Sequence, residues 1–389
     1  MRRLLSLLIL PLMALCTMGC ESGERFDSSL FTQVLYRPQY ASGFEIRATE
    51  GGKATLLVCH NPWQGAQDVT QHLLIDPEGM FDITHSHNVQ RIEGPAQRIV
   101  CMSSSYVAML TAIGKSELTV GVSGIDFISD KYVNDHRDKV RDVGYDNNID
   151  YEMLIALAPD IVLLYGVNAA SAMELKLREL GIPYAYIGEY VEPSPLGKAE
   201  WVVAIAEIAG CREAGEKFFS EIPARYNHLK ELAASATSKP KVMLNTPYAD
   251  SWYMPSTDSY MARLIDDAAG DYLYDRNTDN TSAVVDNEEA YLMAASADRW
   301  INVGQFYSLK ELRSRYPKLA SIECVKSGNI FNCTRRLSPR GGNDFWESGV
   351  IRPDVILGDL IKIFHPELSL PATDESQSEG ELYYYTQLE

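Results

Sequence analysis

The length, composition and charge of this chain already exclude some functions. Its 389 residues allow two or three domains with sizeable cores, and 46% hydrophobic and 23% charged residues are ordinary for a globular protein. The formal net charge of −18 argues against a nucleic acid as partner, because phosphate binding depends on basic contacts. A small anionic ligand stays open, since such a ligand responds to local charge.

The beginning of the chain has the pattern of an export signal. Arg2 and Arg3 are followed by an apolar run over 4–15, which is shorter than the roughly 20 residues that a membrane-spanning helix needs. The sequence Thr17-Met18-Gly19-Cys20 then resembles a bacterial lipoprotein signal, in which the cysteine is acylated after cleavage. We therefore predict a signal peptide over 1–19, a lipid anchor at Cys20 and a location on the periplasmic face of the cell envelope. An uncleaved signal-anchor helix is the alternative.

The next segments differ in character. Residues 20–43 are polar and irregular, which predicts a tether, and residues 44–96 have the pattern of a β-rich extension with short strands and glycine turns. His85 and His87 alternate on one predicted strand face. Two histidines without a third ligand are typical of polar surface, so we predict no metal site.

Apolar strands alternate with helices from residue 97 onward. We expect strands at 98–102, 118–122, 161–166 and 184–187, with helices between them. Strands separated by helices indicate a parallel sheet that is covered on both faces. We assign an N-terminal α/β lobe to 97–211.

A helical pattern near the middle of the chain predicts a connector over 212–237. Its apolar residues recur at steps of three and four: Phe218, Ile222, Tyr226, Leu229, Leu232 and Ala236. Such a helix would be about 37 Å long at 1.5 Å per residue. Pro223 predicts a kink or two abutting helices. An ordinary surface helix is the alternative.

The strand and helix pattern restarts after the connector and predicts a C-terminal α/β lobe over 238–368. We expect a hairpin over 322–333 around Gly328-Asn329, which would place Cys324 opposite Cys333. We favour two buried thiols over a disulfide there. The residues 369–389 show no period, which predicts a tail.

The two lobes share an internal pattern. Asp150-Tyr151-Glu152 and Asp286-Asn287-Glu288 each start a short helix, which is followed by an aspartate (Asp160, Asp298), an apolar strand and a glycine. Two related units around one connector would enclose a cleft, and clefts between domains are favoured ligand sites. Chance similarity of two such units is the alternative.

The region 97–368 resembles the periplasmic substrate-binding proteins of ABC importers for iron–siderophores, haem and cobalamin. The most specific run is 151–162, YEMLIALAPDIV, and 195–201, 343–347 and the β-rich extension resemble members from Bacteroidetes. The resemblance implies an α/β fold of two Rossmann-like lobes with parallel sheets, joined by one long helix. It also implies partners, the permease and ATPase subunits at the inner membrane, with one glutamate on each lobe docking the permease. Glu152 matches the first, and Glu288 or Glu289 the second.

The ligand is expected where loops leave the carboxyl ends of the strands. The residues at these places in the first lobe are Ser103, Ser104, Ser105, Tyr106, Tyr145 and Tyr165. In the second lobe they are Tyr248, Trp252, Tyr253, Arg335, Arg336, Arg340 and Trp346. Aromatic side chains suit a large ring-shaped ligand, although each tyrosine has a core role as its alternative.

The three arginines suggest an anion site, with a solvated loop as the alternative, because guanidinium groups bind carboxylates and catecholate oxygens. The expected transported ligand is then an anionic iron chelate or haem. Cobalamin is the second choice, since compact cobalamin binders have a shorter loop before Asp344. We expect a monomer without a cofactor.

The sequence has no Gly-x-Ser-x-Gly, His-Glu-x-x-His or phosphate-type glycine loop, so we do not predict an enzyme. A cleft hydrolase and a surface scaffold lipoprotein whose working part is the β-rich extension are the competing interpretations.

Overall fold

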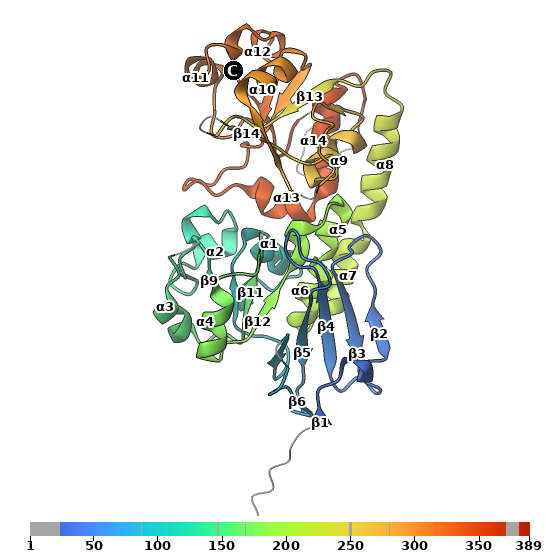
Figure 1. Ribbon diagram of the computed structural model, residues 1–389, viewed down its shortest axis with the longest axis vertical. Coiled ribbons are helices and arrows are strands. Elements are labelled where there is room, and N and C mark those ends of the chain that lie inside the picture. Colours follow the sequence, from blue (N-terminus) through green and yellow to red (C-terminus); the bar gives the residue numbers. More distant parts are fainter. Residues whose placement is uncertain are drawn as a thin grey trace, which may run out of the picture.

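The computed structural model describes residues 24–86, 88–145, 148–167, 169–248, 251–279, 281–370 and 381–389. The predicted signal peptide, Cys20 and His87 lie outside these ranges. The C-terminal α/β lobe lies above the N-terminal α/β lobe in Figure 1, and we call them the upper and the lower lobe. An N-terminal sheet stands beside the lower lobe. Within the described ranges, no helix combines the length and apolar character needed to cross a membrane.

The N-terminal lobe is built on a five-stranded parallel sheet of order β10-β9-β8-β11-β12. Its central strands are entirely apolar and buried on both faces, as expected for a sheet between helix layers. The strands are β8 (Ile99–Cys101), β9 (Thr119–Val122), β10 (Arg141–Asp142), β11 (Ile161–Leu164) and β12 (Tyr184–Tyr186). The helices are α1 (Ser104–Ala112), α2 (Lys131–Asp135), α3 (Tyr151–Leu157), α4 (Met173–Leu180), α5 (Pro195–Glu200) and α6 (Val202–Ile208).

The C-terminal lobe has a sheet of order β15-β13-β17-β18-β19, parallel except for the last strand. The strands are β13 (Lys241–Leu244), β15 (Asp271–Tyr272), β17 (Arg299–Ile301), β18 (Ile330–Asn332) and β19 (Thr386–Gln387). A separate antiparallel pair is formed by β14 (Ser251–Met254) and β16 (Ala283–Asp286). The helices are α9 (Tyr260–Asp267), α10 (Asn287–Ala295), α11 (Leu309–Arg315), α12 (Glu323–Lys326), α13 (Ser348–Ile351) and α14 (Pro353–Phe364).

The two lobes repeat one topology. The order β9-β8-β11-β12 in one sheet corresponds to β15-β13-β17-β18 in the other. The repeated aspartate has the same task in both: Asp160 Oδ2 accepts hydrogen bonds from the N–H groups of Gln97 and Arg98, and Asp298 Oδ2 accepts one from Lys241. Each aspartate thus fixes the start of the first strand of its lobe. The predicted two-lobe α/β fold is confirmed.

The connector consists of two helices, α7 (Arg212–Ser220) and α8 (Ile222–Ala234). Pro223 lies in the first turn of α8, where its missing N–H breaks no helical hydrogen bond. Figure 1 shows α8 running along one side of the molecule to the upper lobe. There Tyr226 Oη donates to Asp267 Oδ2 at 2.6 Å, and Arg225 Nε donates to Asp354 Oδ2 at 2.8 Å. Of the two forms predicted at Pro223, the structure has abutting helices.

The N-terminal extension is a five-stranded sheet of order β2-β3-β4-β5-β7. Alternate residues of β4 belong to two different hydrophobic cores. Leu57 and Cys59 pack against the N-terminal lobe, whereas Leu56 and Val58 pack in a separate core with Phe31. The strands are β2 (Gln33–Tyr36), β3 (Phe44–Ala48), β4 (Thr55–His60), β5 (Thr70–Ile75) and β7 (Val89–Ile92), with β1 (Glu24–Arg25) paired to β6 (Phe81–Asp82).

The predicted tether over 20–43 is therefore wrong for the described part of that segment. Residues 24–36 contain two strands, and Phe31 is fully buried against the outer face of the extension sheet. Isolated aromatic residues in an irregular segment have no period, so their burial is not visible in the sequence.

Two buried carboxylates fasten the extension to the N-terminal lobe. Glu200 of α5 accepts hydrogen bonds from Tyr36 Oη and from the N–H groups of Gln39, Tyr40 and Ala41, at 2.7–2.8 Å. Glu192 accepts bonds from the N–H groups of Ser42 and Gly43 and from Trp201 Nε1. A side chain at position 43 would have its Cβ 2.7 Å from the Trp201 ring, so only glycine fits there.

The predicted hairpin over 322–333 is also wrong. Residues Glu323–Lys326 form α12, and β18 instead pairs with β17 and β19, so that it gains both partners from distant segments. Cys324 and Cys333 are free and buried, which confirms the preference for thiols.

The predicted tail over 369–389 is wrong for 381–389. β19 joins the sheet, and Asp359 accepts hydrogen bonds from the N–H groups of Tyr383, Tyr384 and Tyr385. The rings of Tyr384 and Tyr385 are buried. A strand added at a sheet edge after a long gap leaves no local pattern in the sequence.

Candidate functional site

A cavity of about 560 Å³ lies between the lobes, at the carboxyl ends of β8 and β12. We call it the inter-lobe cleft. This is the edge at which α/β sheets bind ligands. The lower lobe contributes Ser103, Ser104, Ser105, 189–193 and Lys198, the upper lobe contributes Pro255, Ser256, 258–261, Thr278, Thr281, Ser282, Trp346 and Val350, and the extension contributes Gln64.

The serines stand at the start of α1. Ser103 is the N-cap residue, but its side chain does not bond to the helix; its Oγ lies 2.8 Å from Ser105 Oγ. Ser105 Oγ donates to Glu189 Oε1 at 2.7 Å. Ser103 and Ser105 therefore form a chain of two hydroxyls that ends on the buried Glu189 carboxylate.

A buried ion pair forms the floor of the inter-lobe cleft. Lys198 Nζ lies 2.7 Å from Glu189 Oε2 and donates to the Glu189 carbonyl oxygen at 2.8 Å. Both side chains are less than a tenth exposed. Removing one partner of such a pair would leave a charge buried without compensation.

Tyr260 presents a buried hydroxyl beside this pair. Lys198 Nζ lies 5.4 Å from the centre of the Tyr260 ring, over its face. The Tyr260 hydroxyl makes no hydrogen bond to any described residue. Burial, with the charge of Glu189, raises the pKa of Tyr260 above its ordinary value, so the hydroxyl keeps its proton. It can therefore donate to a polar group of a bound molecule.

Aromatic rings from both lobes face the inter-lobe cleft. Trp346, from the short turn Asp344–Trp346, is 48% exposed, and Tyr190 of the lower lobe is 46% exposed. Trp346 stands edge-on to Phe345, which is buried and holds it in place. Exposed rings of this kind offer flat apolar surface to a large ligand.

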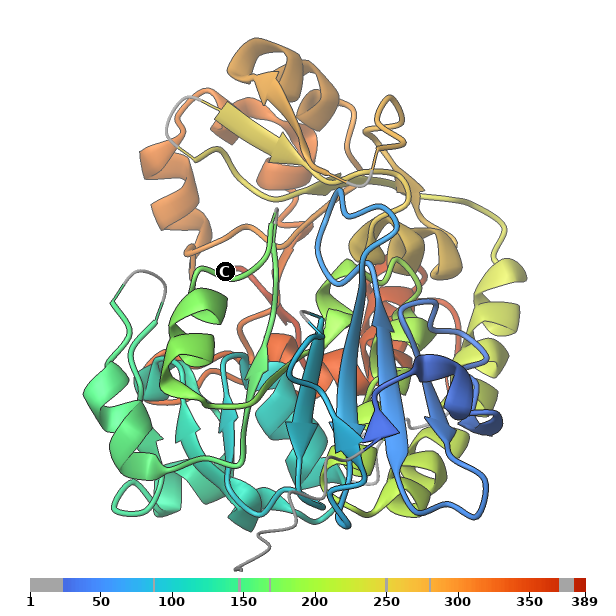
Figure 2. The same ribbon diagram turned by 60° about the horizontal axis from the view of Figure 1, so that its bottom comes forward.

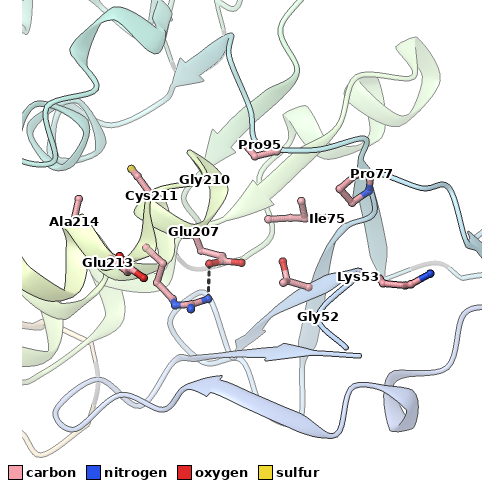
Figure 3. Close-up of a pocket in the computed structure, with 12 residues that line it drawn as sticks. Gly52, Lys53, Ile75, Pro77, Pro95, Glu207, Gly210, Cys211, Glu213 and Ala214 are labelled. Atoms are coloured by element: carbon pink, nitrogen blue, oxygen red, sulfur yellow. Dashed lines mark hydrogen bonds and ion pairs between the residues drawn. The ribbon is translucent and has the colours of Figure 1, made fainter. Parts of the chain in front are cut away.

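A second cavity, of about 660 Å³, lies where the extension meets the corner between α6 and α7 (Figure 3). Glu207 and Arg212 form an ion pair in it. Pro95 lines it, a few residues before β8 begins, so the cavity lies at the amino end of the N-terminal sheet. Because ligands bind at the carboxyl ends, we place the candidate site in the inter-lobe cleft.

Comparison with known proteins agrees with this geometry. The sequence model of the periplasmic binding protein family matches residues 99–337, more than half of the chain. The chain belongs to the periplasmic binding protein family. An uncharacterized lipoprotein of Methanocaldococcus jannaschii is 28% identical over 291 residues, which is 72% of this chain and 68% of the relative. A second, uncharacterized protein of that organism is 25% identical over 285 residues, 70% of this chain and 83% of the relative.

Solved structures with the same fold include a periplasmic haem-binding protein of Pseudomonas aeruginosa, with a TM-score of 0.55 and 16% identity over 72% of this chain and 96% of that one. A periplasmic vitamin B12 binding protein of Vibrio cholerae has a TM-score of 0.51 and 13% identity, and the match covers 69% of this chain and 96% of that one. At these identities the likeness concerns the fold. The family consists of solute-binding proteins.

The predicted ligand residues of this periplasmic binding protein divide into two groups. Ser103, Ser104, Ser105 and Trp346 line the inter-lobe cleft. Tyr106 and Trp252 do not, because both are core residues: Tyr106 Oη donates to the carbonyl oxygens of Leu164 and Ile187, and Trp252 Nε1 donates to that of Leu244. Other predicted residues outside the described lining are Tyr145, Tyr165, Tyr248 and Tyr253.

Each of the three arginines of the predicted anion site pairs with a carboxylate. Arg335 pairs with Glu381, Arg336 with Asp344 at 2.6 Å, and Arg340 with Asp126 at 2.9 Å. Arg335 and Arg336 line a different cavity, of about 580 Å³, to which Ser129, Asp130 and Lys131 also contribute. Each guanidinium already has a carboxylate partner, and none lines the inter-lobe cleft.

The lining residues of the inter-lobe cleft that the sequence analysis missed include Glu189, Tyr190, Lys198 and Tyr260. One signal was present for Glu189 and Lys198. The stretch 187–201 has charged residues within a run that is otherwise apolar, and buried charges of this kind are normally paired. Tyr260 is the first residue of the amphipathic helix α9, and no comparable sequence signal indicates its place in the cleft.

The predicted docking glutamates occupy equivalent places on the two lobes. Glu152 and Glu288 are exposed in the first turns of α3 and α10, which Asp150 and Asp286 cap. Glu289 pairs with Arg276, so of the two C-terminal candidates Glu288 is the exposed one. An exposed apolar residue follows each, Ile155 after Glu152 and Leu292 after Glu288.

Proposed function

We propose that this periplasmic binding protein is a lipid-anchored carrier that captures a metal chelate in the inter-lobe cleft and delivers it to an ABC permease. The observation that carries the proposal is the composition of the inter-lobe cleft: rings from both lobes, Tyr190, Tyr260 and Trp346, stand over a floor of hydroxyls and one neutralised ion pair. Rings suit a flat or globular chelate, and the hydroxyls suit its polar rim.

The charges favour a chelate with little negative charge. Lys198 is the one cation among the described residues that line the inter-lobe cleft, and Glu189 already neutralises it. The acids Glu189, Glu192 and Asp258 also line it. The lining of the inter-lobe cleft therefore gives no support to the expectation of an anionic iron chelate. An uncharged ferric siderophore and a corrinoid fit this charge balance, and haem, which carries two negatively charged propionates, is the anionic class to compare with them.

The donor set supports a complete chelate over a bare metal ion. Neither histidine nor cysteine occurs among the described lining residues, and the whole described part of the chain has no cluster of three or more metal-ligating side chains. A ligand that brings its own metal donors suits such a surface.

Two further observations support the delivery step and the anchor. Glu152 and Glu288 are exposed and related by the internal repeat, so a permease with two matching basic pockets would engage both lobes at once. The relative from Methanocaldococcus jannaschii that is 28% identical is described as a lipoprotein, which agrees with the signal predicted at Cys20.

Ligand titration tests the proposal. The protein is titrated with haem, cobalamin and ferric siderophores of different charge, and tryptophan fluorescence is recorded. We expect at least one dissociation constant below about 10 μM, which corresponds to about −7 kcal/mol. Trp346→Ala and Tyr260→Phe should weaken that binding, whereas the exposed Tyr248→Phe should not. If no chelate binds more tightly than about 10 μM, the proposal is wrong.

A further inference from the structure

One loop of the N-terminal extension reaches the inter-lobe cleft. Residues 61–69 connect β4 to β5, and Figure 2 shows this blue loop rising from the two long strands toward the upper lobe. The backbone N–H of Gln64 donates to the carbonyl oxygen of Val167 at 2.8 Å. Val167 follows β11, so the loop lies over the carboxyl end of the N-terminal sheet.

The loop has a defined conformation. Asn61 N–H donates to the Val69 carbonyl oxygen at 2.8 Å, and Asn61 Oδ1 accepts from Val69 N–H at 3.0 Å, which closes the base. Asn61, Gly65 and Asp68 have positive φ angles of 44°, 78° and 57°. Asn, Asp and Gly are the residues that adopt this conformation most readily.

The N-terminal lobe is shaped to receive the loop. Trp63 packs edge-on against Tyr186, with ring centres 5.3 Å apart. A Cβ on Gly166 would lie 2.8 Å from Trp63 Cβ, and a Cβ on Gly188 would lie 3.6 Å from Pro62 Cα. Glycine at position 166 thus permits the close approach of Trp63.

We propose that the loop 61–69 is a third wall of the ligand site and that Gln64 contacts the ligand. The inference deepens the proposed function and depends on it for the identity of the ligand. Gln64 lines the inter-lobe cleft together with Ser103, Ser104 and Ser105. Its side chain both donates and accepts hydrogen bonds, so it would select a chelate with amide or hydroxyl groups on its rim.

The attachment of the extension agrees with this role. The helix α5 holds residues 36–41 through Glu200 and supplies Lys198 to the cleft floor. The extension is thereby fixed to the same element that shapes the ligand site. This favours a part in ligand binding over an independent scaffold.

A matched pair of variants tests the contact. Gln64→Ala removes the side chain that lines the inter-lobe cleft, and Gln67→Ala removes an exposed glutamine of the same loop that is not among the lining residues. Dissociation constants are measured with the chelates named above. We expect Gln64→Ala to weaken the best ligand about five- to tenfold, the size of one hydrogen bond, and Gln67→Ala to leave it unchanged. Equal affinities of both variants and the wild type would overturn the inference.

A second measurement needs no ligand and separates the two proposals. Ser104→Cys places a thiol in the inter-lobe cleft, and its alkylation rate is followed by mass spectrometry of that peptide, alone and combined with Trp63→Ala. Thermal unfolding checks that both variants are folded. We expect faster alkylation when Trp63 is removed, because the loop is then released from Tyr186. An unchanged rate would mean that the loop does not cover the site, whereas failure of all chelates to bind the wild type would reject only the proposed function.

Discussion

The Glu347 side chain of the upper lobe accepts a hydrogen bond from the backbone N–H of Ser129 in the lower lobe, with an Oε2 to N distance of 2.8 Å. A few residues away, Arg340 pairs with Asp126, again across the lobes. In Figure 1 the segment between β18 and α13, to which Arg340 and Glu347 belong, extends above α2, on the side of the molecule opposite to α8. The lobes are therefore joined on two sides, by the connector and by these contacts.

Two-sided attachment predicts little movement of the lobes when a ligand binds. We expect no resolvable change in the radius of gyration on adding saturating ligand, as measured by X-ray scattering. A Cβ on Gly342 would lie 2.7 Å from the Phe127 carbonyl oxygen, so Gly342→Ala should separate this contact and permit a larger change. A large change in the wild type would contradict the prediction.

The pH dependence of stability should report on Glu347. Burial, together with the charges of Asp344 and Asp130, raises the pKa of Glu347 to about 8, and the hydrogen bond from Ser129 N–H opposes this rise. The folded protein thus keeps this proton to higher pH than the unfolded chain, whose value is 4.5. The contribution of protonated Glu347 to the free energy of unfolding is fully present below pH 4.5 and is lost as the pH rises to about 8.

Glu347→Gln removes the titration and keeps an acceptor for Ser129. The variant should gain stability relative to the wild type as the pH rises from 5 to 8.5, up to roughly 4–5 kcal/mol. Thermal unfolding across this pH range measures the difference, with the exposed Glu213→Gln as control. Parallel curves for wild type and Glu347→Gln would show that Glu347 titrates normally.

Glu200 should be the residue whose loss releases the extension. Its carboxylate is fully buried and accepts four hydrogen bonds from residues 36–41. Glu200→Gln replaces one acceptor oxygen by a donor, and hydrogen bonds to charged groups contribute about 1.5–3 kcal/mol each. We expect a loss of roughly 3 kcal/mol or more and faster hydrogen exchange at residues 37–43. Unchanged exchange there, with Glu213→Gln as reference, would refute this role.

Permease docking should depend on the two exposed glutamates. Glu152→Ala or Glu288→Ala should reduce ligand-stimulated ATPase activity of the reconstituted importer about tenfold or more at limiting binding protein, because each removes a charge pair across the interface. The ligand dissociation constant should stay the same. Glu289→Ala should have a smaller effect, since Glu289 already pairs with Arg276. Full activity of the Glu152→Ala, Glu288→Ala double variant would exclude docking through these residues.

The sequence alone determined the architecture of the lobes. Apolar runs such as 161–164 predicted buried parallel strands, and the repeated aspartates 160 and 298 pointed to a duplicated unit. Pro223 predicted the break in the connector. These features could be predicted because the hydrophobic pattern of neighbouring residues indicates whether a strand is buried and where a helix ends. The serines at 103–105 and Trp346 followed from the position of the strand ends.

Only the tertiary structure showed which charged side chains are paired and which segments line the inter-lobe cleft. Arg340 is separated from Asp126 by 214 positions, and Tyr40 from Glu200 by 160, so no local pattern shows that these groups meet. The arginine loop suggested an anion site without showing that each arginine pairs with a carboxylate, and the extension was considered as a separate scaffold although Gln64 of its loop lines the inter-lobe cleft. Electrostatic and hydrogen-bond partners depend on distances in space, and in this chain those distances are set by packing between segments far apart in sequence.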